Sequence, residues 1–387
     1  MIFVKIYMLI LAIETSCDDT CAAVIKIKKN RKFEILSNVI SSQVKLHSKY
    51  GGVFPSLAKR EHQKNLPIVV RKALKEAKNP KINLIAVTSG PGLEPCLWTG
   101  INFSKELARK MKLPIVPVNH IEAHILANVI DKKPVFPAVC LIVSGGHTQI
   151  ILMEKIGEYK ILGETRDDAA GECFDKTARI LGLGYPGGPI VAKKAAELKS
   201  KKLKINLPRP MIHQKNYDFS FSGLKTAVLY EFKKRPLKIR KSKQYVQEMC
   251  AEIQQAIIDV LIRKTIIAAR DYRVKSIILS GGVAANEELR KQFQSATSNQ
   301  CSKITLSLPP KNLCTDNAAM VAVAGYLNTE LPKEAKVRKK MKFSFDWQKG
   351  RRGLRPLLPP RFHKWKLGKK HWKEIKANAN LKIGEKL

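Results

Sequence analysis

Short apolar runs alternate with longer amphipathic stretches along most of the chain. Apolar runs of this length, bounded by polar turns, predict buried β-strands, and we expect them at Leu9–Ile13, Ala22–Ile27, Leu84–Thr88, Ala138–Val143, Gln149–Met153 and Ser276–Leu279. The amphipathic stretches repeat their apolar residues at helical spacing and predict helices at 58–78, 102–111, 244–270 and 315–329. Strands that alternate with helices indicate an α/β architecture.

Two segments share the same order of features. LAIETSCDDTCAAVI at 11–25 and LIVSGGHTQIILM at 141–153 each contain an apolar run, a polar turn and a second apolar run. We therefore expect two related halves, each opening with a β-hairpin whose turn faces a shared cleft. A third turn, LSGGVAANEEL at 279–289, follows a predicted strand and opens a helix. The exposed N–H groups of such a helix start attract phosphate.

Length and composition limit the classes of protein to consider. The chain has 387 residues, of which 44% are hydrophobic, which suggests two or three folded domains. No run of about 18 apolar residues occurs, so we expect no membrane span. The apolar start has no small-residue cleavage site, and we interpret it as a first strand rather than a signal peptide, with Met8 as an alternative first residue. Eight cysteines without a CxxC pair indicate a reduced, cytoplasmic protein.

The charge of the chain points to a polyanionic partner. The formal net charge is +39, and a field of that sign favours nucleic acid, although a generally basic proteome would give the same balance. The segment KKRPLKIRKSK at 233–243 carries seven Lys/Arg and no acid, and residues 333–387 carry nineteen Lys/Arg against four Asp/Glu. A solvated surface explains the first segment equally well. We expect the folded core to end near residue 332 and the rest to be a basic, flexible tail.

The tail also contains Trp347, Trp365 and Trp372. Cationic residues with interspersed aromatic rings are typical of segments that bind nucleic acid by charge and base stacking. A tail that orders on a partner protein, or one that stays disordered, fits the composition equally well.

The segment VNHIEAH at 118–124 is the first candidate for chemistry. His120 and His124 stand four residues apart, so a helix would place both imidazoles on one face. One alternative is that the two histidines are half-buried polar residues that bind no metal. The zinc-protease motif H-E-x-x-H requires a glutamate directly after the first histidine, whereas Glu122 lies two residues later and about 200° around the helix. The remaining interpretation is a metal that needs a third ligand from elsewhere in the chain.

Asp316 in LCTDNAAM is the candidate for that third ligand. The alternative is that Asp316 is a helix N-cap, a common role for aspartate. Two imidazoles and one carboxylate leave open positions on a metal, which suits Fe(II) or a catalytic Zn(II).

Four glycine turns are predicted at strand ends: SGPGL at 89–93, SGGHT at 144–148, PGGP at 186–189 and SGGVAAN at 280–286. Glycine allows a close approach of backbone to ligand. One such turn means little, but four in a chain with two related halves favour a nucleotide cleft between lobes. No Walker A pattern is present.

These motifs occur in an order that closely resembles the bacterial TsaD family, the tRNA N6-adenosine threonylcarbamoyltransferases. The resemblance covers roughly residues 8–330. It rests on IETSCDDT at 13–20, SSQVKLHSKYGGVFPSLAKREH at 41–62, SGPGL, VNHIEAH, VSGGHTQI at 143–150, DDAAGECFDKTARILGLGYPGGP at 167–189, FSFSGLKTAV at 219–228, SGGVAAN and CTDNAAM.

The resemblance implies an actin/Hsp70/sugar-kinase-like fold with two RNase H-like lobes around a nucleotide cleft, plus a basic C-terminal extension. We expect an N-terminal lobe over 8–129, completed by about 318–332, a C-terminal lobe over 130–317, and the tail over 333–387. The implied reaction transfers a threonylcarbamoyl group from threonylcarbamoyl-AMP to N6 of adenosine 37, forming t6A in tRNAs that read codons beginning with A.

The resemblance also implies particular site residues. The metal, Fe(II) first and Zn(II) as the alternative, would be held by His120, His124 and Asp316. Substrate-binding positions would be Ile142, Val143, Ser144, Gly145, Gly146, Asp175, Gly188 and Asn286. A general base is not evident, and Glu14 and Asp18 are candidates only, since solvated turn residues explain them as well.

Two positions depart from the family pattern. Ala192 stands where many relatives carry a ribose-contacting aspartate, so ribose binding would rest more on Asp175. Glu94 and Trp98 follow SGPGL where smaller apolar residues are common. Neither departure touches the three metal candidates.

The implied partners are tRNA, threonylcarbamoyl-AMP, a TsaB-like paralogue and a TsaE-like ATPase, with a threonylcarbamoyl-AMP synthase acting upstream and no membrane. Two other functions remain open from the sequence. One is a metalloprotease, which Glu122 argues against. The other is an ATP-binding module of sugar-kinase or chaperone type without transfer activity.

Overall fold

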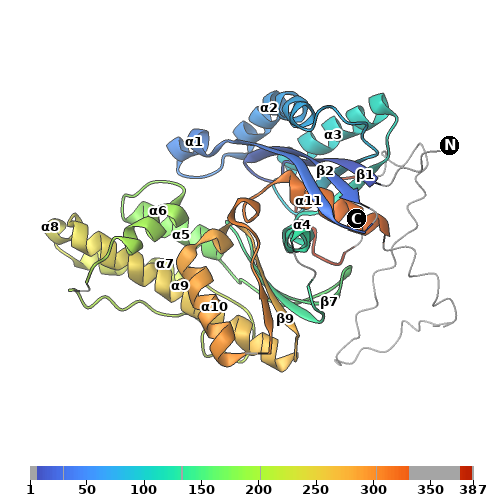
Figure 1. The fold of residues 1–387 in the computed structure, drawn as a ribbon. Coiled ribbons are helices and arrows are strands. Elements are labelled where there is room, and N and C mark those ends of the chain that lie inside the picture. Colours follow the sequence, from blue (N-terminus) through green and yellow to red (C-terminus); the bar gives the residue numbers. More distant parts are fainter. Residues whose placement is uncertain are drawn as a thin grey trace, which may run out of the picture.

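The computed structural model describes residues 7–28, 30–131, 134–200, 202–301, 303–330 and 375–385. Within these residues the chain forms two five-stranded sheets, each covered by helices (Figure 1). The fold is of the actin/Hsp70/sugar-kinase type, as predicted, and each lobe is built on one of the two sheets.

The first sheet has the strand order β3-β2-β1-β4-β5. Strand β2 runs antiparallel to both of its neighbours, β1 and β3, whereas β4 and β5 run parallel to β1. The elements of this part of the chain are β1 (Tyr7–Glu14), β2 (Asp19–Lys28), β3 (Phe33–Ser42), α1 (Val44–His47), α2 (Pro55–Glu76), β4 (Leu84–Gly90), α3 (Glu94–Met111), β5 (Ile115–Asn119) and α4 (His120–Leu126).

The second sheet, β10-β9-β6-β7-β8, repeats this topology. Strands β6, β7 and β8 are antiparallel, and β9 and β10 run parallel to β6. The predicted hairpins are therefore confirmed as β1–β2 and β6–β7. The elements here are β6 (Ala138–Val143), β7 (Thr148–Lys155), β8 (Glu158–Glu164), α5 (Ala170–Ile180), α6 (Gly187–Ala196), α7 (Ser222–Lys234), α8 (Leu237–Arg240), α9 (Lys243–Asp271), β9 (Ser276–Ser280), α10 (Glu287–Gln300), β10 (Thr305–Ser307) and α11 (Ala318–Glu330).

An apolar layer joins the two sheets. One core cluster includes side chains from β1, such as Ile10, from β6, such as Ile142, and from both α4 and α11. Helix α11 follows the second sheet in sequence but packs on β1, β2, β4 and β5 of the first. Figure 1 shows α4 and α11 at the centre of the molecule, between the two sheets. This position allows residues on α4 and at the start of α11 to meet.

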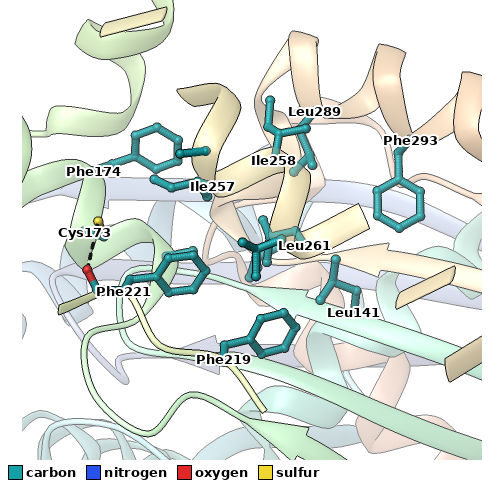
Figure 2. Packing of buried hydrophobic residues seen from close by; sticks show 14 of the residues in the cluster. Leu141, Cys173, Phe174, Phe219, Phe221, Ile257, Ile258, Leu261, Leu289 and Phe293 are labelled. Atoms are coloured by element: carbon teal, nitrogen blue, oxygen red, sulfur yellow. Dashed lines mark hydrogen bonds between the residues drawn. The ribbon is translucent and has the colours of Figure 1, made fainter. Parts of the chain in front are cut away.

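The largest core lies in the second lobe, where α9 packs with α5, α7 and α10 over the sheet. Figure 2 shows Ile257, Ile258 and Leu261 of α9 among aromatic rings such as Phe174 and Phe221. The helix predicted at 244–270 is confirmed as α9, and its apolar residues pack in this core. The same core includes Val143 and Leu279, near the ends of β6 and β9.

Every predicted strand is present, but four strands were not predicted. Strand β3 alternates buried and exposed side chains, and β8 is half-buried along most of its length, so neither forms an apolar run. Strands β5 and β10 are short. Helix α3 starts at Glu94, eight residues before the predicted start at 102, because Pro95 occupies the first turn, where proline is well tolerated.

Most of the predicted tail over 333–387, namely residues 333–374, lies outside the described residues. Residues 375–385 are described, and for them the prediction of a flexible tail is wrong. Ile375, Leu381 and Ile383 are buried in the core of the molecule. The N–H of Asn378 donates to the Ser89 carbonyl at 2.8 Å, so this segment docks beside the SGPGL turn.

None of the helices among the described residues is both long and apolar enough to cross a bilayer.

Candidate metal centre

Helix α4 begins where β5 ends, and its start is fixed by an N-cap. Asn119, the last residue of β5, accepts hydrogen bonds from the N–H groups of Ile121 and Glu122 at 2.9 and 3.1 Å. An asparagine in this role satisfies two of the free N–H groups at the helix start. His120 is therefore the first helical residue, and His124 lies about one turn later on the same side.

Asp316 approaches this pair from the start of α11. The helix is capped by Asn317, whose side-chain oxygen accepts from the Met320 N–H at 3.0 Å, so the alternative role of Asp316 as the cap is wrong. The carboxylate of Asp316 is therefore not used as the cap, and its Oδ1 lies 3.1 Å from His124 Nε2 and 3.5 Å from His120 Nε2.

The three side chains form a group that fits a divalent metal. One ligand atom from each of His120, His124 and Asp316 lies within 4.8 Å of the other two. The histidine rings are nearly perpendicular, with centroids 4.6 Å apart, so both Nε2 atoms point to one place. Two imidazole nitrogens and a carboxylate oxygen are donors that Fe(II) and Zn(II) accept. The structure thus contains the predicted metal-binding site.

The charges of the site are strongly coupled. Burial alone would lower the pKa of His120, but the carboxylates of Glu14 and Asp316 raise it to about 9. Burial and the neighbouring His120 lower the pKa of His124, although Asp316 and Glu14 act in the opposite direction. Burial would raise the pKa of Asp316, yet the adjacent histidines hold it well below its usual range. The group therefore favours one charged and one neutral imidazole around an ionised carboxylate.

Glu14 lies at the end of β1 behind His120 and is fully buried. Its Oε2 lies 3.0 Å from His120 Nδ1 and accepts from the Thr88 hydroxyl at 2.6 Å, and its Oε1 accepts from the Ser16 N–H at 2.5 Å. Both oxygens are thus used by protein groups. Glu14 is not placed to take a proton from a substrate, so the geometry does not favour it as a general base.

Glu122 points away from the metal group, as its position on the helix predicted. Its carboxylate accepts from the Tyr159 hydroxyl at 2.9 Å and from the Asn328 side-chain amide at 3.1 Å. Burial raises its pKa. A buried glutamate held in this way cannot act on a water at the His120–His124 pair, which removes the geometric basis of a zinc protease.

The predicted substrate loop runs from the end of β6 into the following turn. Ile142 and Val143 are buried, whereas Gly145 and Gly146 are exposed, and a Cβ added at either glycine would meet nothing within 4 Å. The Ser144 hydroxyl accepts from the His147 N–H at 3.0 Å and holds the turn. The two glycines therefore present bare backbone to open space.

Two other glycine positions brace this loop. A Cβ at Gly171, in the first turn of α5, would lie 2.5 Å from the Ser144 carbonyl oxygen, and one at Gly281 would lie 2.3 Å from that of Val143. Gly281 also has a φ of +91°, which favours glycine. The SGGHT and SGGVAAN turns and the start of α5 are thus packed side by side.

The second lobe is also joined to the metal helix. The Ser280 hydroxyl, at the end of β9, donates to the His124 carbonyl at 2.7 Å. The hydroxyl oxygen of Ser280 in turn accepts from the Asn128 amide at 2.8 Å. The glycine turns of the second sheet and the metal ligands on α4 therefore belong to one connected site.

The other predicted substrate residues make structural hydrogen bonds. Asp175 on α5 accepts from the Gly187 N–H at 2.7 Å and so organises the start of α6, beside Gly188. Asn286 caps α10 by accepting from the Leu289 N–H at 2.9 Å, and its amide donates to Gln254 at 2.8 Å. Whether these side chains also contact a substrate stays a prediction.

Asp18 differs from Glu14. It lies in the turn between β1 and β2, and its Oδ2 is buried without a hydrogen-bond partner among the described residues. Burial and the charge of Asp316 raise its pKa. Of the two candidate bases, Asp18 is therefore the one with a free carboxylate oxygen.

Sequence reasoning missed several contributors to the site. His147, from SGGHT, has its pKa lowered to about 4 by burial and by the neighbouring His120 and His124. His62 on α2 holds the β1–β2 turn, because its ring contacts the Thr20 hydroxyl at 2.8 Å and the Cys17 carbonyl at 2.9 Å. These neighbours of His147 and His62 are distant from them in sequence. The only sequence signal for these two histidines is therefore the motifs that contain them.

Comparison with known proteins relates this chain to one family of tRNA-modifying enzymes. The family described as TsaD, tRNA N6-adenosine threonylcarbamoyltransferase, matches residues 34–323. A protein of that name from Thermosipho africanus is 48% identical over 324 residues, covering 82% of this chain and 94% of the relative. One from Syntrophomonas wolfei is 46% identical over 317 residues, covering 81% and 90%.

Among solved structures, HypF from T. kodakarensis superposes with a TM-score of 0.53 at 13% identity, over 86% of this chain and 50% of that protein. At this identity the likeness concerns the fold alone. From the family match and the close relatives over most of its length, the chain belongs to the TsaD family.

Proposed function

We propose that this protein is a tRNA N6-adenosine threonylcarbamoyltransferase, which forms t6A on tRNA. The observation that supports this most is the convergence of His120, His124 and Asp316 beside the bare glycine turn at 144–148, in a chain of the TsaD family. The donor would be threonylcarbamoyl-AMP and the acceptor N6 of adenosine 37 in tRNAs that read codons beginning with A.

The metal would be Fe(II), with Zn(II) as the alternative, held by His120, His124 and Asp316. When bound, it would supply Lewis-acid stabilisation and orientation for oxygens of the adenylate. Both metals accept two imidazoles and a carboxylate as ligands, so the ligand types do not distinguish Fe(II) from Zn(II).

The chain's own groups would hold the adenylate. The exposed turn at Gly145 and Gly146 offers backbone N–H groups to phosphate oxygens, and the start of α10 at SGGVAAN offers more. The nucleophile is an exocyclic aromatic amine, which is weak. Rate acceleration must therefore come from positioning and from stabilised charge at the carbonyl.

Asp18 is our candidate for the group that accepts the proton from N6. Its Oδ2 has no hydrogen-bond partner among the described residues, and its raised pKa brings a carboxylate closer to the range useful for a base at neutral pH. Adenosine 37 lies in a loop, where a base can be turned outward more cheaply than from a duplex.

The tRNA backbone would contact the basic segment 233–243. It spans the end of α7, helix α8 and the start of α9 at the outer end of the second lobe (Figure 1). Lys233, Lys234 and Lys238 are exposed there. Exposed lysines on a protruding corner suit phosphate contacts, which position an RNA without reading its sequence.

Turnover would involve further proteins. We expect a threonylcarbamoyl-AMP synthase upstream, with a TsaB-like paralogue and a TsaE-like ATPase as partners. The reaction would take place in the cytoplasm, where the eight cysteines, free in the structure, remain reduced.

Mass spectrometry of nucleosides tests the proposal. An unmodified tRNA that reads an A-starting codon is incubated with the protein, its partner proteins and threonylcarbamoyl-AMP, and is then digested. We expect threonylcarbamoyladenosine from this tRNA and none from the same tRNA with guanosine at position 37. Strong ATP hydrolysis without tRNA dependence and without the modified nucleoside would favour an ATP-binding module instead.

A further inference from the structure

We infer that Glu14 is a positioning residue for the metal centre: it orients His120 as a ligand rather than acting on a substrate. The inference depends on the proposed function only in that the proposed function names the reaction at this metal centre. Its geometric basis is independent of that reaction, because it concerns how one carboxylate holds one imidazole.

The two nitrogens of the His120 ring have different surroundings. Nε2 faces Asp316 at 3.5 Å, in the group that fits a metal. Nδ1 faces Glu14 Oε2 at 3.0 Å. A metal-binding histidine usually donates its second ring N–H to a carboxylate or carbonyl, which fixes the tautomer and raises the basicity of the ligand nitrogen. Glu14 stands in that place.

Glu14 is itself held from several sides. Its Oε2 accepts from the Thr88 hydroxyl at 2.6 Å, and its Oε1 accepts from the Ser16 N–H at 2.5 Å. The side chain is fully buried. A carboxylate with this support cannot swing toward a substrate, but it can keep the ring of His120 in one orientation.

His124 provides the contrast. Its Nδ1 is buried and has no hydrogen-bond partner among the described residues, while its Nε2 lies 3.1 Å from Asp316. The two histidines are therefore supported unequally. Within the part of the chain that is described, orientation by a carboxylate acts on His120 and not on His124.

The arrangement also links the metal helix to the first sheet. Glu14 ends β1 and Thr88 lies on the adjacent parallel strand β4, whereas His120 starts α4 after β5. The ends of these neighbouring strands meet at one edge of the sheet. Glu14 and Thr88 thus set the place of a ligand that lies far from both in sequence.

The test is the affinity for Zn(II) alone, measured by competition with a chromophoric chelator at one fixed pH. Glu14→Gln should weaken binding by about 10–100-fold, because a neutral amide supports the ligand less and one of its atoms must face a donor. Thr88→Ala, which leaves Glu14 in place, should weaken binding less. Glu14→Asp should retain part of the wild-type affinity.

Glu122→Gln is the matched control. It makes the same substitution at another buried glutamate with two hydrogen-bond donors, but that residue does not contact a metal ligand. Its Zn(II) affinity should equal that of wild type. Circular dichroism of each metal-free variant checks that the fold is intact.

Unchanged Zn(II) affinity in folded Glu14→Gln would overturn the inference, and loss of product in that same variant would point to a general base. If Glu14→Gln does not fold, Thr88→Ala decides: weaker Zn(II) binding supports the inference and unchanged binding overturns it. Because the Zn(II) assay contains no adenylate or tRNA, failure of the transferase proposal would not change its result.

Discussion

At the scale of single residues, His120 is held between two carboxylates. Glu14 lies at one ring nitrogen and Asp316 at the other. Their charges outweigh burial and raise the pKa of His120 to about 9, from an ordinary value of 6.5. In the metal-free protein the protonated imidazole therefore stabilises the fold, and this stabilisation must depend on pH.

We predict that the metal-free protein loses stability as the pH rises from about 6.5 to 9. A raised folded-state pKa adds stability that is complete below the unfolded value and is lost as the pH passes through the folded value. The loss should be at most about 3 kcal/mol. Chemical denaturation after chelator treatment measures it.

His120→Gln serves as the control, because it removes the titrating group. The free energy of unfolding of this variant should vary less with pH over the same window. A metal-free wild type whose stability is flat across the window, or identical in shape to that of His120→Gln, would mean that the imidazole is neutral in the folded protein.

At this scale the sequence predicted the metal ligands but not their support. His120 and His124 follow from spacing on one helix, and Asp316 from a motif of the family. Glu14 and Ser16 contact His120, and Thr88 contacts Glu14, only because parallel strands bring their ends together. No local pattern indicates these contacts, so the sequence alone leaves Glu14 as a candidate base.

At the scale of elements, composition predicted a flexible tail, and this prediction is wrong for the segment 375–385. Its residues are mostly small or polar, and its three buried apolar side chains are separated in sequence. Yet the Lys382 carbonyl accepts from Asn119, the cap of α4, at 3.3 Å, and the Ile375 carbonyl accepts from Lys105 at 2.6 Å. Tertiary contacts, rather than periodicity, order this segment.

We predict that Leu381→Ala lowers the free energy of unfolding by about 2–3 kcal/mol, as expected for truncation of a buried aliphatic side chain. Leu381 is buried beside Gly90, where the chain of the SGPGL turn passes. Denaturant unfolding of wild type and variant measures the difference.

Lys382→Ala is the matched control in the next position, because its side chain is exposed and only its carbonyl is used. It should leave stability within about 0.5 kcal/mol of wild type. Equal stability of Leu381→Ala and wild type would mean that the segment is not docked in solution.

The strands also divide into those that local sequence predicts and those that only tertiary pairing explains. Those with continuous apolar runs, such as β4 and β6, were predicted at nearly their observed bounds, since both of their faces are buried. Strands β3 and β8 were missed because one face meets solvent and the apolar positions are separated. Pairing with β2 and β7, rather than their own composition, makes them strands.

At the scale of the whole molecule, local patterns indicated the internal repeat but not the helix that crosses between the two halves. The two segments with the same order of apolar runs and polar turns correctly indicated two related halves, and these halves have the same topology. The resemblance implied that residues of about 318–332 complete the N-terminal lobe, but local patterns could not show that α11 crosses from the second sheet to the first, because its apolar residues cover all sides of the helix. That crossing brings Asp316 to α4.

We predict that the positive corner at the outer end of the second lobe carries part of the tRNA affinity. Replacing Lys233, Lys234 and Lys238 by alanine should weaken tRNA binding and reduce the slope of log affinity against log salt by about 1 for each lost phosphate contact. Filter binding over a range of salt concentrations measures both effects.

A triple variant on α2, with Lys64, Arg71 and Lys75 changed to alanine, removes the same charge from another exposed surface. It should change the salt slope less than the α7–α8 variant does. Equal slopes for both variants would show that net charge alone matters, and that no particular surface holds the RNA.

The central claim is that His120, His124 and Asp316 form one metal site that threonylcarbamoyl transfer requires. The most direct measurement determines bound metal and threonylcarbamoyladenosine in the same samples of wild type, His120→Ala, Asp316→Ala and Glu122→Gln. We predict that the first two variants lose both metal and product, and that Glu122→Gln keeps both. An Asp316→Ala protein without metal that modifies tRNA at the wild-type rate would contradict the claim.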